Sequence, residues 1–214
     1  CEGYLEWDVP SIDVIHSLEL LGLPYTGPTP LLYDPSKPLM KYVAHTVGIS
    51  TPMHAQVDAG AIARAVAGPG GLAAGDAMLA AATKGLRYPL FVKPAKAGDS
   101  LGVDDHSVVA DHAALLTQAL ALADEYPDVL IEEFIDGREF TVLVAENPSN
   151  PREPIAFVPA EFGFPPGECF KHYDMKWVDY HQMTWSPVAD ELLAARLKDM
   201  SRKQFVGLGG CSYG

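Results

Sequence analysis

The chain has 214 residues, of which 48% are hydrophobic and 20% charged, an ordinary composition for a globular protein with a sizeable core. Its formal net charge of -13 argues against an extended nucleic-acid surface and against attraction to an anionic membrane. No apolar run reaches the roughly 18 residues that a membrane-spanning helix requires. Three cysteines, Cys1, Cys169 and Cys211, lie far apart without a CxxC pair, which indicates neither a disulfide framework nor a zinc site. We therefore expect a protein of the reducing cytoplasm, without nucleic-acid or membrane partners.

Two short helices are predicted in the first part of the chain. The segment 8–22 repeats apolar residues at helical spacing and ends at Gly22. The segment 36–48 offers Ser36 as its N-cap and Gly48 as its C-cap. The second helix therefore follows the first after one turn-rich loop.

The middle of the chain combines helices with a buried strand. Residues 58–86 are rich in alanine and glycine and predict two short helices with a break between them. The apolar segment 88–95 predicts a buried strand, and the segment 111–126 predicts an amphipathic helix.

Further strands follow this helix. The segment 129–144 predicts two strands around the turn 135–139, and the segment 154–162 predicts another strand. A polar loop is expected at 167–182, and a last helix within 189–205. Because strands and helices are interspersed without strict alternation, we expect an α+β or mixed α/β fold rather than a regular doubly wound sheet.

A lysine inside an apolar strand is the first candidate for chemistry. The sequence contains neither GxxxxGK[ST] nor a GxGxxG between a strand and a helix, which excludes a P-loop and a Rossmann fingerprint. Instead, Lys93 lies within the strand PLFVKP, and the flexible segment 98–102 follows it. A lysine beside glycines whose amides can approach an anion forms a candidate phosphate site. The alternative is a purely structural lysine at a strand end, followed by a glycine turn.

Carboxylates within an otherwise apolar segment are the second candidate. In a strand, Glu132 and Glu133 face opposite sides, so at least one of them must meet a polar partner. If the segment lines a crevice, its backbone can read the edge of a base, and Glu139 can accept hydrogen bonds from ribose hydroxyls. The alternative is a solvated hairpin whose charges mark the exposed face.

Several segments, in order along the chain, carry a family resemblance. They are LELLGLPYTG, the helix that contains Lys37, GISTP, YPLFVKPAKAGDSLGV and VLIEEFIDGREFTV. Together they resemble the ATP-grasp enzymes, most closely the D-alanine-D-alanine ligase group. The resemblance implies a fold in which two α+β subdomains clamp ATP, with Mg2+ as cofactor. It also implies a reaction that joins a carboxylate to an amine through an acyl phosphate, so the expected partners are ATP and small amino acids.

On the phosphate side, the resemblance carries over residue by residue. Lys37 and Lys93 match the two lysines that such ligases direct at the phosphates of ATP. Gly98, Ser100 and Gly102 match the mobile loop that covers those phosphates.

The resemblance also implies the remaining site residues. Glu139 matches the carboxylate that binds ribose, Lys176 matches a further lysine that contacts the nucleotide, and Glu6 resembles a substrate-side acid. Ser100, Lys176 and Glu6 are therefore the catalytic candidates. The adenine-reading linker between the subdomains is matched by four consecutive residues, Glu132, Glu133, Phe134 and Ile135.

Two positions depart from the family pattern. Dipeptide-forming members show two adjacent serines where this chain has Asp99 and Ser100, and a tyrosine where it has Trp177. Because those side chains help to close the loop over the substrates, the amino acid used by this chain stays open. We keep two alternatives to a D-alanine-D-alanine ligase: an ATP-grasp ligase for another amino acid, and a nucleotide-binding module without ligase activity.

The resemblance also implies a domain organisation. We expect residues 1–30 to end a pre-ATP-grasp domain, residues 31–130 to form the central ATP-grasp subdomain, and residues 131–214 to begin the C-terminal subdomain. The chain begins with Cys rather than Met, so we expect a fragment of a longer protein. The Mg2+ ligands are expected beyond Gly214, so the 214 residues alone should be inactive. A homodimer is possible for the family.

Overall fold

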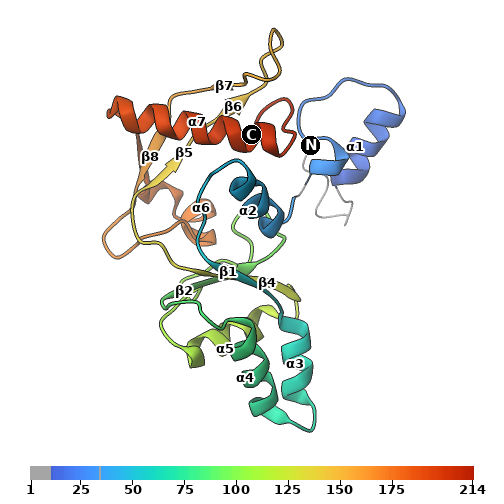
Figure 1. Ribbon diagram of the computed structural model, residues 1–214, viewed down its shortest axis with the longest axis vertical. Helices are drawn as coiled ribbons and strands as arrows, with labels where there is room; N and C mark the ends of the chain where they lie inside the picture. Colours follow the sequence, from blue (N-terminus) through green and yellow to red (C-terminus); the bar gives the residue numbers. More distant parts are fainter. Residues whose placement is uncertain (1–10, 34) are drawn as a thin grey trace.

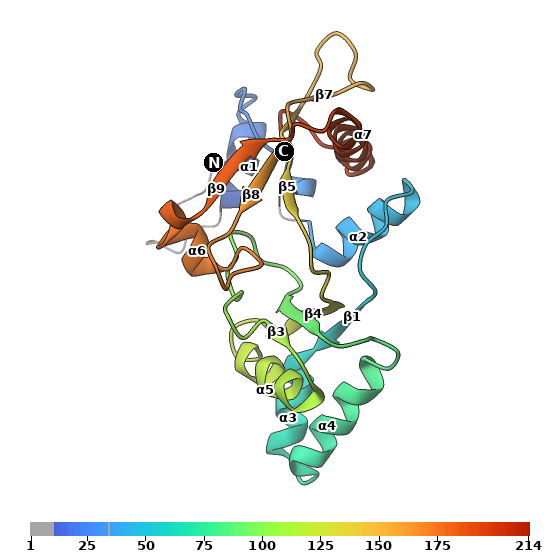
Figure 2. The same ribbon diagram turned by 90° about the vertical axis from the view of Figure 1, so that its left-hand side faces the viewer.

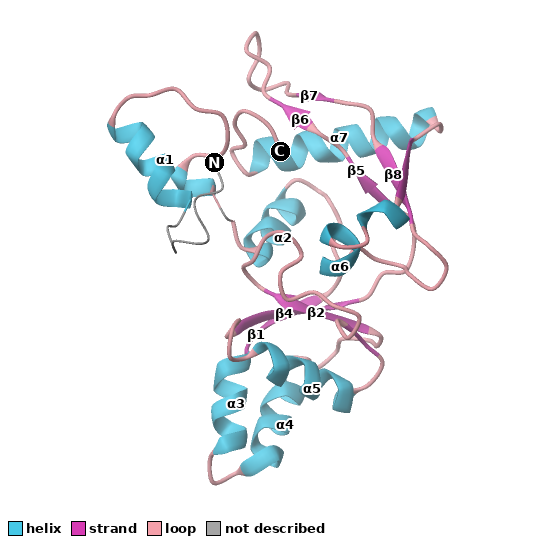
Figure 3. Ribbon diagram, turned by 180° about the vertical axis from the view of Figure 1, so that it is seen from behind, coloured by secondary structure: helices cyan, strands magenta, loops and turns pink. Residues whose placement is uncertain are grey.

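The computed structural model describes residues 11–33 and 35–214 (Figure 1). The molecule is elongated and has two parts along its long axis. A four-stranded sheet with three helices below it forms one part, and small sheets beside a long helix form the other. Helices α2 (Lys37–Thr46) and α6 (Tyr173–Trp177) lie between the two parts in all three views (Figures 1, 2 and 3).

The four-stranded sheet has the order β1-β4-β2-β3, and every pair in it is antiparallel. Its central strands, β2 (Leu90–Pro94) and β4 (Asp128–Glu133), pair with Val92 opposite Ile131. The outer strands are β1 (His54–Asp58) and β3 (Val108–Val109).

One face of this sheet is covered by helices. These are α3 (Ala59–Ala67), α4 (Gly71–Ala82) and α5 (His112–Leu122), and Figure 1 shows them below the strands. Asp58 and Asp111 cap α3 and α5, because their carboxylates accept the backbone N–H of Ala61 and Ala114. The hydrophobic core lies between helices and sheet and contains four fully buried strand residues, Leu90, Val92, Val129 and Ile131.

The other face of the sheet carries the alternate residues of the same strands. They include Phe91 and Lys93 on β2 and Leu130 and Glu132 on β4. Unlike the aliphatic core on the helix-covered face, this face therefore presents charged and aromatic side chains.

The second part of the molecule is built from short antiparallel strands. One sheet contains β5 (Glu139–Thr141), β8 (Ala160–Gly163) and β9 (Thr184–Pro187), and another contains β6 (Val144–Ala145) and β7 (Ile155–Ala156). The helical elements are η3 (Tyr180–Gln182) and α7 (Glu191–Gly207). Helix α1 (Ser11–Leu20) and η2 (Pro30–Leu32) lie at the side of this part (Figure 3).

The helices predicted from the sequence are confirmed, and so is the N-cap of α2, but its C-cap is Val47, one residue before the expected Gly48. Ser36 accepts a hydrogen bond from the N–H of Leu39, and Gly48 has a φ of 77°. The mixed α+β fold class is confirmed as well.

The structure adds to or differs from the sequence-based expectations in three details. The two strands expected within 129–144 are present, and they belong to different sheets, because β4 lies in the four-stranded sheet and β5 pairs with β8. The strand expected at 154–162 is divided between β7 and β8, because Pro159 between them has no N–H for a ladder. The expected polar loop 167–182 contains α6 and η3, since His172 caps a helical turn.

Candidate functional site

A pocket of about 710 Å³ lies on the face of the four-stranded sheet opposite to α3, α4 and α5. Its walls come from β2, β4, α2, α7 and the strand residues near β6. Side chains that line it include Lys37, Lys41, Lys93, Glu132, Gln204 and Phe205. Three lysines around one pocket are unusual in a chain with a net charge of -13, and they favour an anionic ligand.

Glu132 holds two of these lysines in place. Lys93 donates a short hydrogen bond to Glu132 Oε1, and Lys41 Nζ lies 2.6 Å from Glu132 Oε2. Burial acts to raise the pKa of Glu132, but the charges and hydrogen bonds of Lys93 and Lys41 outweigh burial and lower it. The carboxylate is therefore ionised and fixes both ammonium groups at the floor of the pocket.

Lys37 connects the pocket to the glycine-containing loop. Its Nζ donates to the carbonyl of Ala97 at 2.6 Å, and its backbone N–H donates to Ala95 O at 2.9 Å. Because Lys37 is the first residue of α2, these bonds tie the start of the helix to the end of β2. Residues 98–102 begin directly after this junction.

The segment 98–102 makes two consecutive tight turns. Asp99 and Ser100 have φ angles of 55° and 60°, and Gly102 has a φ of 69°. At Gly102 a Cβ atom would lie 2.6 Å from Pro94 Cγ, so a side chain there would collide with the end of β2. The two turns are closed by backbone hydrogen bonds, because the Leu101 N–H donates to Gly98 O at 3.0 Å and the Val103 N–H donates to Ser100 O at 3.0 Å.

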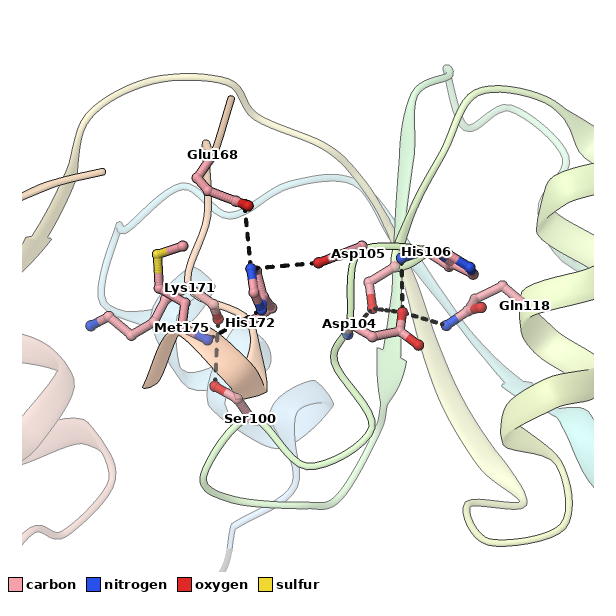
Figure 4. Close-up of polar contacts among 10 residues, drawn as sticks. Ser100, Asp104, Asp105, His106, Gln118, Glu168, Lys171, His172 and Met175 are labelled. Carbon is pink, nitrogen blue, oxygen red and sulfur yellow. Dashed lines mark hydrogen bonds and ion pairs between the residues drawn. The ribbon is translucent and has the colours of Figure 1, made fainter. Parts of the chain in front are cut away.

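Helix α6 holds this loop from the other side. Lys176 Nζ lies 2.9 Å from Asp99 Oδ1, and the Trp177 indole N–H donates to Asp99 O at 3.0 Å. The Ser100 hydroxyl donates to Lys171 O at 3.5 Å (Figure 4). Asp99 and Trp177, the two departures from the family pattern, are thus in direct contact.

An aromatic cluster continues from the pocket floor. The rings of Phe91 and Phe134 stack at 6.1 Å, and Phe170 meets both rings edge-on at 5.1 and 6.2 Å. Lys93 Nζ lies 5.2 Å from the centre of the Phe91 ring. Ile135, next to Phe134, is 66% exposed. The sheet face therefore changes from cationic to aromatic along β2 and β4.

Glu139 lies on β5, beyond the residues that line the pocket. Its carboxylate is 3.5 Å from Lys171 Nζ, and that ammonium group lies 3.2 Å from the centre of the Phe162 ring. Burial lowers the pKa of Lys171, while the neighbouring Glu139 carboxylate acts in the opposite direction. Glu139 thus has a cationic partner in the absence of any ligand.

The side chain of Glu133 lies away from the pocket. It shares the helix-covered face with Ile131, as alternation predicts, and forms a bidentate pair with Arg87 at 3.1 and 2.9 Å. The Arg87 hydrogen bonds are the main reason that the pKa of Glu133 is lowered. Of Glu133, therefore, only the backbone is left to contribute to the expected adenine-reading segment 132–135.

The structure thus brings Lys37, Lys93 and Glu132 together, and it groups Gly98, Ser100, Gly102 and Lys176 around one loop. Glu6 lies outside the described residues. The sequence-based reasoning missed Lys41, although its position four residues after Lys37 placed both on one face of α2. It also missed Lys171, which no pattern in the sequence marks.

Neither a metal-binding cluster nor a membrane-spanning helix occurs in the part of the chain that the structure describes. Within residues 11–33 and 35–214, no group of three or more His, Cys, Asp or Glu side chains could hold a metal ion. In the same residues, no helix has both the length and the apolar character needed to cross a bilayer.

Comparison with known proteins supplies the family. Residues 69–213 match the family model described as the D-ala D-ala ligase C-terminus. The chain belongs to the D-alanine-D-alanine ligase family. It is 33% identical over 164 residues to a D-alanine--D-alanine ligase from Marinomonas sp., covering 75% of this chain and 43% of the relative. It is 32% identical over 203 residues to one from Pseudomonas fluorescens, covering 92% of this chain and 53% of the relative.

Solved structures of family members share the fold. The VanG D-Ala:D-Ser ligase from Enterococcus faecalis superposes with a TM-score of 0.67 at 23% identity, covering 94% of this chain and 53% of that one. The D-alanyl-alanine synthetase A from Vibrio cholerae also gives 0.67, at 18% identity, covering 95% and 57%. The expected ATP-grasp fold is confirmed. The chain spans about half the length of the curated relatives it matches.

Proposed function

We propose that the protein is an ATP-dependent carboxylate-amine ligase of the D-alanine-D-alanine ligase type. One observation carries the proposal: within a chain of this family, a pocket lined by Lys37, Lys41 and Lys93 lies next to a glycine-containing loop. Transfer of a phosphoryl group to a carboxylate brings two anions together, and fixed cations are what such a step needs.

The phosphates of ATP are the natural ligands of the lysines. In this proposal Lys37 and Lys93 neutralise the phosphates, and Lys41 contributes through the Glu132 carboxylate that it shares with Lys93. Gly98, Ser100 and Gly102 cover the phosphates with backbone N–H groups, and Lys176 joins them from α6.

In this proposal the adenosine part of ATP binds beside the aromatic cluster of Phe91, Phe134 and Phe170. The backbone of Glu132, Glu133, Phe134 and Ile135 would read the edge of the adenine, with the Phe134 ring beside the base. The Glu139 carboxylate would accept hydrogen bonds from the ribose hydroxyls, in exchange for part of its contact with Lys171.

The residues of this chain then support the two-step reaction by binding, neutralising charge and excluding water. The lysines stabilise the charge that develops as the γ-phosphoryl group reaches the substrate carboxylate. The loop 98–102, held by α6, keeps water from the acyl phosphate until the amine attacks. No covalent enzyme nucleophile is required.

Mg2+ belongs to the proposal as the usual companion of ATP, but the described residues do not form a site for it. Glu132 is the carboxylate that lines the pocket, and two ammonium groups already occupy its oxygens. A hard cation needs oxygen ligands that are free to bind it. We therefore assign no Mg2+ ligand to this chain and no catalytic step to the ion.

The domain division is also a proposal. Residues 31–130 and 131–214 would form the two ATP-grasp subdomains after a first segment, 1–30. In this proposal the segment 134–138, between the end of β4 at Glu133 and the start of β5 at Glu139, would connect the subdomains, a few residues after the expected boundary, which falls within β4. Cytoplasmic location, where ATP is available, and a homodimer belong to the same proposal.

A ligase for another amino acid is the second candidate. It is favoured by Asp99, which places a carboxylate in the loop and pairs it with Lys176. The test is to express the protein from its complete reading frame and to measure ADP release with ATP, Mg2+ and single amino acids, D-alanine and D-serine first. Release that depends on D-alanine supports the first candidate, and release with another amino acid supports the second. ATP binding without any amino-acid-dependent release would support a nucleotide-binding module.

A further inference from the structure

A buried histidine sits where α6 begins. His172 is 7% exposed, and the two nitrogens of its ring have different neighbours (Figure 4). Nδ1 accepts a hydrogen bond from the backbone N–H of Met175 at 3.3 Å. On the opposite side, Nε2 lies 3.3 Å from Glu168 Oε2 and 3.5 Å from Asp105 Oδ1.

The cap fixes the tautomer of the ring. Nδ1 can accept from Met175 only with its lone pair free, so the proton of the neutral imidazole must be on Nε2, facing the two carboxylates. A second proton can add only at Nδ1. There it would face the N–H of Met175, donor against donor, and the N-cap of α6 would be lost.

Two carboxylates lie at the other nitrogen of the buried ring. Glu168 and Asp105 attract a positively charged imidazolium at Nε2, but neither can replace the lost acceptor at Nδ1. They are the charged groups that the described residues bring to the ring. Lys171, next to it in sequence, points away toward Glu139, and Phe170 contributes its ring edge.

The position of α6 decides how the loop 98–102 is held. Tyr173 N–H donates to Val103 O at 3.1 Å, so the first residue of α6 is joined to the end of the loop. One turn later, Lys176 and Trp177 hold Asp99. Every one of these contacts depends on the helical turn that His172 caps.

We propose that His172 is a positioning residue: its neutral ring docks α6 on the loop 98–102, and its protonation releases α6 from the loop. The link to catalysis rests on the proposed function, since the loop matters to the reaction only if it covers ATP. The conformational part of the proposal concerns this chain alone and is testable without any ligand.

The first experiment measures amide hydrogen exchange at Met175 and Tyr173, corrected for the intrinsic pH dependence of exchange. Protection is compared at pH about 8 and about 5, a range that spans the titration of an ordinary imidazole. The variants are His172→Asn, whose side chain can accept the same hydrogen bond but does not titrate, and His172→Ala, which removes the cap. His106→Asn, an exposed histidine near the same loop, is the matched control.

Loss of one N-cap corresponds to a change of about fivefold in the opening equilibrium. Protection of Met175 and Tyr173 in the wild type and in His106→Asn should therefore fall about fivefold on acidification. His172→Asn should stay protected at both pH values, and His172→Ala should show protection about fivefold below that of the wild type at pH about 8, at both pH values. A fall of the same size in His172→Asn, or full protection in His172→Ala with an unchanged circular dichroism spectrum, would overturn the proposal.

The second experiment measures KM for ATP and kcat of the protein from its complete reading frame. Acidification should raise KM for ATP in the wild type, whereas the KM of His172→Asn should stay flat across the same range. If no ligase activity is found, the proposed function fails while the exchange result still decides the role of His172. If activity is present and the KM profiles of both proteins coincide, the positioning role is wrong.

Discussion

The Glu132 carboxylate forms ion pairs with two lysines in a largely buried environment. Its side chain and that of Lys41 are each about one-tenth exposed, and that of Lys93 is about one-fifth exposed. Such a cluster is costly to assemble, but it is costlier still to break, because the remaining charges stay buried without compensation. The residues that suit the pocket to an anion therefore lower the stability of the protein through the cost of burying their charges.

Replacement of the Glu132 carboxylate measures how much the fold depends on the ion pairs. Glu132→Leu leaves two partly buried ammonium groups without a counter-ion and should lower the free energy of unfolding by about 3 to 5 kcal/mol. Urea denaturation measures the loss. The matched variant is Glu132→Leu combined with Lys41→Met, which should be less destabilised than the sum of its single changes, because the two side chains interact directly. Strict additivity would show that the ion pair contributes nothing.

Glu139 provides the corresponding test on the nucleotide side. If the carboxylate binds ribose, Glu139→Gln should weaken ATP binding by about 1.5 to 3 kcal/mol through loss of a charged hydrogen bond, with little effect on the melting temperature. Isothermal titration with ATP gives the affinity. Glu161→Gln is the control, since Glu161 is an acid of the neighbouring strand β8 that pairs with Arg138 instead. Equal affinity of Glu139→Gln and wild type would leave Glu139 only its contact with Lys171.

At the scale of elements, the close contact between α3 and α4 depends on one glycine. A Cβ atom at Gly75 would lie 2.4 Å from Val66 Cγ2 and 3.2 Å from the carbonyl oxygen of Ile62. The two helices approach each other closely because α4 has no side chain there. They in turn cover the face of the sheet opposite to the pocket.

Gly75→Ala tests this contact, because helix propensity and packing predict changes of opposite sign in the free energy of unfolding. By helix propensity alone the change would stabilise the protein by up to about 1 kcal/mol. Overpacking should win, with a net destabilisation of about 1 to 3 kcal/mol in chemical denaturation. Ala77→Gly, at an exposed position of the same helix, calibrates the propensity term. A stabilised Gly75→Ala variant would mean that α3 can move away without cost.

Elements with a strong pattern of their own could be predicted from the sequence, and those defined by their partners could not. The helix with Ser36 before it and Gly48 after it carries both signals within a dozen residues. Strand β1 does not: only Val57 is buried, and the strand exists because its backbone pairs with β4. Strand β9 is exposed throughout and ends in a proline, so only its pairing with β8 defines it.

The candidate site divides in the same way. Lys93 could be found because a lysine inside an apolar strand is conspicuous, and the resemblance added Lys37 and the loop. The pairing of Glu132 with Lys41 could not be found, because it joins α2 to β4 across the sheet and depends on how the helix sits. Nor could the sequence show that Trp177 would meet Asp99, residues that are 78 positions apart.

For the molecule as a whole, buried and paired carboxylates set the response to acid. Against the effect of burial, Lys93 and Lys41 lower the pKa of Glu132, and hydrogen bonds from Arg87 and Arg138 lower the pKa values of Glu133 and Glu161. These groups bind protons less readily in the folded state than in the unfolded state. Their contribution to stability is therefore complete above the ordinary value of 4.5 and is lost as the pH falls through the lowered values.

Urea unfolding from pH 7 down to pH 3 measures this dependence. The free energy of unfolding should change little between pH 7 and 5, apart from any contribution of the histidines, and fall steeply below about pH 4.5. The Glu132→Leu variant, which has one such carboxylate fewer, should fall less steeply. A wild-type curve that stays level to pH 3 would contradict the lowered pKa values.

The two walls of the lysine-lined pocket come from opposite ends of the described chain. Gln204 on α7 donates to Met40 O on α2 at 3.0 Å, a contact between residues separated by 164 positions. Contacts of such high sequence separation form late in folding, because the entropy of closing a long loop must be overcome before they are gained. We therefore expect the pocket to be assembled late, after the helices and local strand pairs are in place. A nucleotide would then bind the native state and not the transition state of folding. ATP should therefore slow unfolding and leave the folding rate unchanged.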